Sequence, residues 1–440
     1  MITDELILYR NFKAQKLLDD LITLFEGEGS TSLAYDAAGR LVTLSMDMGF
    51  TGDLWHMFLT YLLANNENAF SRACEIRGHV EGTVNDVALH DLGVFFQMFY
   101  FDILDIDRRY KIDCFRHLTD FDMTDEGKMF NKRIRDRIAG LSEKLSSSSG
   151  PSEMKEHLED FYKDYGVGMF GLHKAFKIHE SLMDNSFTIE PVKRVQHINL
   201  EDLVGYELQK KKLIENTEAF IKGLPANNCL LYGDSGTGKS SSIKGIMNRY
   251  YEKGLRIIEI YKHQFRFLND IMALLKDRNY KFLIYMDDLS FEDRETEYKY
   301  LKAIIEGGLE KKPANVLIYA TSNRRHLVHE GFKDKLDRGE NDDIHESDTV
   351  EEKLSLYHRF GVTIYYGKPT PKEFKTIVTE LAGRQGIEMD EEELLLQANR
   401  WEIEHGGLSG RTASQFIDNI RARTEFFSRT EKNTCGQGDQ

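Results

Sequence analysis

The chain has 440 residues, a formal net charge of −15 at pH 7 and 41% hydrophobic residues. This length allows roughly two to four domains with sizeable cores. The acidic balance argues against bulk, non-specific binding to nucleic acid, although it leaves room for a local basic surface. The four cysteines, Cys74, Cys114, Cys229 and Cys435, are scattered and form no CxxC pair. They indicate thiols in a reducing compartment and argue against a disulfide framework or a zinc site.

No targeting or membrane segment is expected. The first residues, Met-Ile-Thr-Asp-Glu-Leu, lack the basic and then apolar pattern of a signal peptide. The most apolar stretch, 94–101, is too short to span a bilayer, and Asp102, Asp105 and Asp107 follow it. We therefore expect a cytoplasmic protein with no membrane span.

Residues 1–190 are predicted to form a mainly helical domain without a catalytic motif. Apolar residues recur at helical spacing in five segments, which are 17–25, 54–63, 87–104, 154–165 and 171–183. The serine run with its following glycine and proline, 146–151, predicts a linker or a loop. We expect this domain to bind a partner or to regulate the rest of the chain.

The most informative segment is a complete phosphate-binding loop of the GxxxxGK[ST] type. It reads Gly233-Asp234-Ser235-Gly236-Thr237-Gly238-Lys239-Ser240. An apolar segment with strand character precedes it, and a helical segment that includes Ser241 follows it. In such a loop the backbone N–H groups point at phosphate oxygens. We expect the loop and Ser241 to bind nucleotide, Lys239 to reach the β- and γ-phosphates, and the Ser240 hydroxyl to ligate Mg²⁺.

From residue 196 onward, short β-branched and aromatic runs alternate with helical stretches. The runs are 229–232, 255–261, 281–286, 316–320 and 362–366. This alternation predicts an α/β fold with a five-stranded parallel sheet covered by helices. The nucleotide-binding core is expected over 196–368 and a helical lid over 369–430.

Polar residues end two of these strand segments. The run 281–286 is followed by Asp287 and Asp288. Asp287 is expected to hold Mg²⁺, directly or through water, and Asp288 to polarise the attacking water. The run 316–320 leads to Asn323, which would face the γ-phosphate. The alternative interpretation of the two aspartates is an acidic turn at the end of a strand.

At this point the chain resembles the AAA+ ATPases over residues 196–428. The segment Ile198 to Tyr206 is similar to the one that borders the adenine in that family, which implies that Leu203, Val204 and Gly205 line the pocket.

The same resemblance implies functional roles for two arginines. The stretch 355–361 looks like the one that carries the arginine finger, so Arg359 would act on the ATP of a neighbouring subunit. The stretch 407–411 resembles the lid segment that bears the second sensor, which places Arg411 on the phosphates. Arg324 and Arg325 are the other candidates, either as surface charge or beside the γ-phosphate.

The sequence resembles even more closely a bacterial family of AAA+-like ATP-binding proteins whose biological role is unassigned. The segments that carry this likeness are 226–228, 287–292 and 320–326. One departure from AAA+ enzymes is that Asp288 stands where glutamate is usual, and its side chain is one methylene shorter. Asp288 can still act as base through a backbone shift or a second water, and Glu292 is the other candidate.

Two further segments invite more than one interpretation. The basic and aromatic stretch 261–267 could touch a polymer, but it also fits the start of a helix with a core face. The acidic segment 334–352, which contains His345, could hold a cation or be a solvated insertion.

The sequence therefore predicts an Mg²⁺-dependent ATPase that couples ATP turnover to the remodelling of a macromolecular partner. We expect a homo-oligomer that binds ATP and ADP, with either a protein or a nucleic acid as partner. The first alternative is a signalling or scaffold switch with very slow hydrolysis. The second is a kinase, for which no acceptor-site pattern is present.

Overall fold

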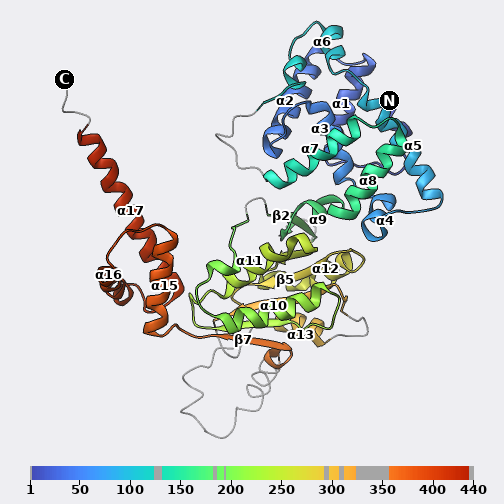
Figure 1. Ribbon diagram of the computed structural model, residues 1–440. Helices are drawn as coiled ribbons and strands as arrows, with labels where there is room; N and C mark the ends of the chain where they lie inside the picture. Colours follow the sequence, from blue (N-terminus) through green and yellow to red (C-terminus); the bar gives the residue numbers. More distant parts are fainter. Residues whose placement is uncertain are drawn as a thin grey trace. The chain divides into compact units, whose positions relative to one another are not determined.

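The computed structural model describes residues 2–122, 131–181, 186–192, 195–291, 297–306, 312–323 and 356–435 (Figure 1). Its described residues divide into two compact units. The first is Met1–Lys174 with Pro191–Arg194, and the second is Ala175–Glu190 with Val195–Gln440.

The first unit is helical. Its helices are η1 (Ile2–Glu5), α1 (Gln15–Glu26), α2 (Thr31–Met48), α3 (Leu54–Asn65), α4 (Ala69–Arg77), α5 (Thr83–Phe99), α6 (Leu104–Tyr110), η2 (Phe115–Leu118), α7 (Lys132–Ser146), α8 (Pro151–Tyr165) and α9 (Gly168–Leu172). Ser30, Asp53 and Asn68 begin α2, α3 and α4 by accepting hydrogen bonds from backbone N–H groups of the first turn. One continuous apolar core joins these helices, with Trp55 fully enclosed in it.

The serine run is a loop inside this unit. Helix α7 ends at Ser146, and α8 begins at Pro151, where proline fits the first helical turn. Both helices contribute buried residues to the same core, so 146–151 separates two neighbouring helices and not two domains.

The prediction of a helix over 171–183 is wrong. Strand β1 (Ala175–Glu180) occupies this segment, and β2 (Phe187–Pro191) follows it. Within β1 the buried Phe176 and Ile178 alternate with the exposed Lys177, and β1 pairs in parallel with β4. Hydrogen bonding to a distant strand therefore decides the conformation, and the second unit begins at Ala175, before the expected boundary near residue 190.

The second unit is built on a seven-stranded sheet in the order β2-β1-β4-β5-β6-β3-β7. Its other strands are β3 (Cys229–Gly233), β4 (Leu255–Glu259), β5 (Lys281–Met286), β6 (Val316–Ser322) and β7 (Val362–Tyr366). These are the five predicted strands, and they pair in parallel. The prediction of only five was wrong because β1 and β2 extend the sheet beyond β4.

Helices surround this sheet (Figure 1). They are η3 (Leu200–Asp202), α10 (Glu207–Ile221), α11 (Lys239–Tyr250), η4 (Tyr251–Lys253), η5 (Lys262–Phe267), α12 (Leu268–Leu275) and α13 (Tyr298–Glu306). The stretch 261–267 is thus a short helix, and its Phe265 and Phe267 are buried. Strand β6 is buried along its whole length, as expected for a central parallel strand.

Three helices follow the sheet and form a small bundle with its own core, at the position of the predicted lid. They are α15 (Pro371–Arg384), α16 (Glu391–Glu404) and α17 (Gly410–Cys435). Thr370 caps α15 in a capping box with Glu373, and Pro371 takes the first helical position. Phe374, Leu394 and Phe416, one from each helix, are buried together.

Among the described residues, no single helix is long and apolar enough to cross a membrane. Helices α5 and α6 together are long and apolar enough to cross a membrane by length and composition only, but they are bent by 60° at the break between them.

Candidate functional site

The phosphate-binding loop connects the end of strand β3 to the N-terminus of helix α11. Gly233 has φ 132°, and a Cβ atom there would lie 2.1 Å from the Tyr366 carbonyl oxygen on β7. Gly236 and Gly238 also have positive φ, 76° and 91°. Only glycine takes these conformations without strain, so the glycines shape the loop and hold it close to the neighbouring strand.

Lys239 lies folded over the loop. Its Nζ donates hydrogen bonds to the carbonyl oxygens of Gly233 at 3.0 Å and Asp234 at 2.6 Å, and its side chain is buried. Burial lowers the pKa of Lys239, and the nearby carboxylates of Asp234, Asp288 and Asp287 oppose this in part. The ammonium group is therefore held at the loop, at the place where phosphate charge would arrive.

Three side chains from three elements meet at the end of β5. Ser240 Oγ donates to Asp287 Oδ1 at 2.7 Å, and Thr321 Oγ1 donates to the same oxygen at 2.6 Å. Partial burial favours the neutral carboxyl group, but the hydrogen bonds from Thr321 and Ser240 outweigh it and lower the pKa of Asp287. Asp287 is therefore held as a carboxylate next to the hydroxyl group expected to ligate Mg²⁺.

Asp288 is held in an unusual backbone conformation. Its φ is 50°, which costs a non-glycine residue free energy. Its backbone N–H donates to Thr321 Oγ1 at 2.9 Å, and its Oδ1 accepts from Asn323 Nδ2 at 2.7 Å. The structure thus brings Asp288 and Asn323 together, and Thr321 organises both aspartates.

We expect Thr321→Val to lower metal affinity or turnover about 10- to 100-fold, as is usual when a group that orients a metal ligand is lost. Thr321 is buried, and valine has a similar shape but cannot bond to Asp287 or Asp288. A titration of ATPase rate against Mg²⁺ measures the effect. Thr217→Val is the matched control, because Thr217 is also buried but bonds to Leu213 and Tyr319. Equal effects of the two variants would contradict the assigned role.

A cavity of about 690 Å³ opens above the loop. The expected site residues that line it are Val204, Ser235, Gly236, Thr237, Gly238, Lys239, Ser240, Ser241, Asp287, Asp288, Asn323 and Arg411, together with the pocket candidate Leu203. Gly233, Asp234, Gly205 and Arg359 are not part of the lining. Asp234 instead accepts a hydrogen bond from the backbone N–H of Lys368 at 3.1 Å.

Sequence reasoning missed one wall of this cavity. Tyr206, Ile377 and Leu381 line it, the last two from lid helix α15. The Tyr206 ring packs near that of Tyr366, with 5.2 Å between centroids, and its hydroxyl donates to the Gly367 carbonyl at 2.9 Å. Burial raises the pKa of Tyr206 to about 12, so the hydroxyl stays protonated. A wall of this kind suits a flat aromatic ligand.

The two arginines from the family resemblance occupy different places. The backbone N–H of Arg411, at the start of α17, donates to the Gly236 carbonyl at 3.1 Å, and the residue lines the cavity. Arg359 is half-buried just before β7. Glu292, Arg324, Arg325 and the acidic segment 334–352 with His345 lie outside the described residues.

The donor atoms at the end of β5 fit a magnesium ion bound together with a nucleotide. Within the described ranges, no three His, Cys, Asp or Glu side chains gather closely enough to hold a metal by themselves. Mg²⁺ commonly takes only one or two carboxylates and completes its shell with water and substrate phosphates. Ser240 and Asp287 supply the hard oxygen atoms that this binding mode needs.

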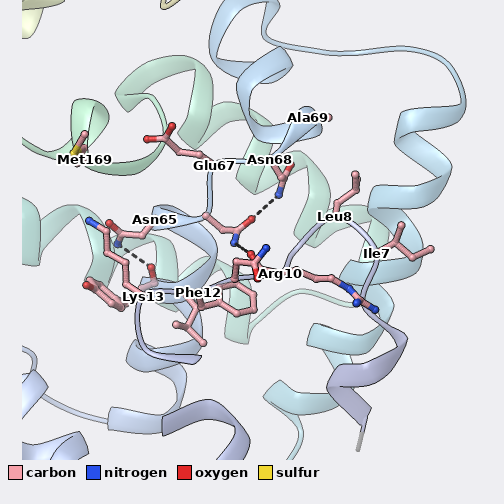
Figure 2. Close-up of a pocket in the computed structure, with 14 residues that line it drawn as sticks. Ile7, Leu8, Arg10, Phe12, Lys13, Asn65, Glu67, Asn68, Ala69 and Met169 are labelled. Carbon is pink, nitrogen blue, oxygen red and sulfur yellow. Dashed lines mark hydrogen bonds between the residues drawn. The ribbon is translucent and has the colours of Figure 1, made fainter. Parts of the chain in front are cut away.

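A second cavity, of about 540 Å³, lies in the helical unit (Figure 2). Its asparagines bond within its own wall: Asn66 Nδ2 to the Arg10 carbonyl at 2.8 Å, and Asn68 Nδ2 to Asn66 Oδ1 at 3.0 Å. Asn65 Nδ2 likewise donates to the Tyr61 carbonyl at 2.9 Å. The bond from Asn66 to Arg10 joins the N-terminal segment to the loop between α3 and α4, and we assign this cavity no ligand.

Several solved structures of Thermotoga maritima RuvB are similar to part of the chain. RuvB described as a Holliday junction branch migration motor has 16% identity and a TM-score of 0.36, with 53% of this chain and 67% of that chain covered. A RuvB variant with one substitution has 18% identity and a TM-score of 0.38, again with 53% of this chain and 67% of that chain covered. No curated protein matches the chain.

A family model matches residues 172–424, which is more than half of the chain. The expected resemblance to a family of unassigned biological role is confirmed by this match. The protein therefore belongs to the family described as "Protein of unknown function (DUF815)".

Proposed function

We propose that the protein is an AAA+-type, Mg²⁺-dependent ATPase. One observation carries the proposal: Ser240 of the phosphate loop, Asp287 at the end of β5 and Thr321 at the end of β6 form one hydrogen-bonded group in the lining of the cavity. A glycine-rich turn without function would not need a carboxylate held in its charged form beside the loop hydroxyl.

Each part of the cavity takes one part of the nucleotide. The loop N–H groups and Lys239 bind the phosphates, and the positive end of the α11 dipole favours their charge. The apolar wall of Leu203, Val204 and Ile377 with Tyr206 receives the adenine. When bound, Mg²⁺ would neutralise phosphate charge between Ser240 and Asp287.

Hydrolysis requires a water molecule in line with the γ-phosphorus. The water oxygen forms a bond to that phosphorus while the bond to the β–γ bridging oxygen breaks, and the water proton passes to a base. Asp288 is our candidate for the base, and Asn323 orients its carboxylate through the hydrogen bond at 2.7 Å. Arg411 would stabilise the charge on the phosphates from the lid side.

The paired aspartates test this assignment. Asp287→Ala removes the metal-positioning carboxylate, so the dependence of activity on Mg²⁺ should change. Asp288→Asn keeps size and hydrogen bonding but removes the base, so ATP should bind and persist unhydrolysed. Radiolabelled ATP bound to each variant, followed over time, measures both. Full turnover in Asp288→Asn would move the base elsewhere, with Glu292 the first candidate.

A second function is favoured by the short Asp288 side chain and its strained backbone. In this alternative, hydrolysis is too slow to do work, and the ATP or ADP state is a switch. Single-turnover and steady-state rates separate the two. One slow turnover with tightly held ADP supports the switch, whereas steady turnover that a partner stimulates supports the motor.

We propose that the helical unit, Met1–Lys174 with Pro191–Arg194, binds the partner or regulates the core, and that ATP turnover in 196–368 with the lid 369–430 is coupled to it in a homo-oligomer. The partner is a protein or a nucleic acid. A pull-down with Asp288→Asn held in ATP tests this, with Lys239→Ala as the control that cannot hold ATP. Equal recovery of the same partners by both variants would contradict coupling.

A further inference from the structure

One buried hydroxyl group beside the proposed metal site lacks a partner. The Tyr285 side chain, on β5, is 3% exposed, and its hydroxyl makes no hydrogen bond within the described part of the chain. Leaving such a group unpaired in the interior costs about 1–3 kcal/mol, so buried hydroxyls are nearly always bonded to protein or to water. The other buried tyrosine on the neighbouring strand, Tyr319, is bonded to Asn216 and Thr217.

The surroundings of this hydroxyl indicate what it faces. Burial raises the pKa of Tyr285, and the negative charge of Asp287 raises it further. The side chains of Ser240, Asp287 and Thr321 all lie close enough to interact with the hydroxyl group and shift its pKa, although none lies at the distance and angle of a well-formed hydrogen bond. Tyr285 is the next-to-last residue of β5, and Asp287 follows the strand directly with its carboxylate close to the Tyr285 hydroxyl.

A second carboxylate strengthens the negative potential here. Glu259, at the end of β4, is aligned with Tyr285 in the parallel pairing of β4 and β5, so its side chain lies on the same side of the sheet as that of Tyr285. Burial raises the pKa of Glu259, and the charge of Asp287 adds to the effect. Two carboxylates and an unpaired hydroxyl on one side of the sheet favour a hydrated cation.

We propose that Tyr285 is a positioning residue for the metal site: when Mg²⁺ is bound and Ser240 turns to the metal, the Tyr285 hydroxyl would donate a hydrogen bond to the Asp287 carboxylate and hold it in place. This inference rests on the proposed function. It explains why a hydroxyl group occurs among the buried and otherwise apolar residues 282–286 of this strand, close to the end that reaches the site.

The test uses ADP binding to the full chain, which needs no turnover. The affinity for a fluorescent ADP analogue is measured without metal and across an Mg²⁺ titration. In Tyr285→Phe the metal-free affinity should stay within about twofold, and the Mg²⁺ concentration for the half-maximal effect should rise about 3- to 10-fold, as for one lost hydrogen bond. The melting temperature of the metal-free variant should be unchanged or higher, because an unpaired buried hydroxyl is removed.

Tyr319→Phe is the matched control, since it removes a buried hydroxyl that is already bonded. It should lower the metal-free melting temperature and leave the Mg²⁺ requirement unchanged. In the Asp287→Ala background, Tyr285→Phe should have no further effect on the Mg²⁺ requirement.

Several outcomes would overturn the inference. An unchanged Mg²⁺ requirement in Tyr285→Phe, or a metal-free melting temperature that falls as in Tyr319→Phe, shows that the hydroxyl serves the fold or nothing. A wild-type protein that binds ADP with no response to Mg²⁺ removes the metal site itself. If the wild-type protein does not bind ADP at all, the proposed ATPase function fails along with it.

Discussion

Lys239→Ala should weaken ATP binding by about 10²- to 10⁴-fold, because two charge-assisted hydrogen bonds to phosphate contribute about 1.5–3 kcal/mol each. The lysine is already held at the loop by the carbonyl oxygens of Gly233 and Asp234, so little freedom is lost when phosphate replaces these partners. Isothermal titration of ATP into the two proteins measures the difference.

Lys253→Ala is a suitable control, since Lys253 is exposed and does not line the cavity. Circular dichroism confirms that both variants fold. A change in affinity of less than about threefold in Lys239→Ala would show that the loop does not bind phosphate.

The second large effect is expected at Arg359. An arginine finger supplied to a neighbouring subunit changes turnover by about 10³–10⁵ in other phosphoryl-transfer enzymes. Because Arg359 does not line the cavity of its own chain, Arg359→Ala should spare ATP binding and cut turnover severely. Steady-state ATPase rates and ATP affinity, measured on the same preparation, separate the two effects.

Mixing Arg359→Ala with Lys239→Ala tests the geometry. The first variant offers a nucleotide site without a finger, and the second offers a finger without a site. Mixed oligomers contain some complete composite sites, so activity should return. A mixture that stays inactive, although the two proteins demonstrably co-assemble, would mean that Arg359 does not act between subunits. Arg324 or Arg325 would then be the better candidates.

The sequence was informative where a local pattern is enough to specify the structure. The five strands predicted between residues 229 and 366 all form, because each is an apolar run bounded by polar or glycine-rich segments. The lid helices follow from periodic apolar residues and the Thr370 cap. In contrast, β1 has only three buried positions, and its conformation depends on pairing with β4, about 80 residues later in the chain.

The candidate site divides in the same way. The loop and the aspartates belong to contiguous motifs, and the sequence alone indicated them. Thr321 acts only because the ends of β5 and β6 lie side by side, so that its hydroxyl reaches Asp287. The walls contributed by Ile377 and Leu381 depend on how the lid folds back beside the loop. Neither relation is local in the chain, so no spacing rule could reveal it.

Hydrogen bonds from backbone N–H groups join the phosphate loop to the lid and to the segment that leads into it. The Arg411 backbone N–H bonds to the Gly236 carbonyl, while the Lys368 backbone N–H bonds to Asp234. Any change that nucleotide makes in this loop therefore alters the free energy of the lid position. Linkage works equally in the other direction, so a molecule whose affinity for the lid depends on nucleotide must change nucleotide affinity by the same factor. Such a partner would tune nucleotide affinity from the lid without touching the nucleotide.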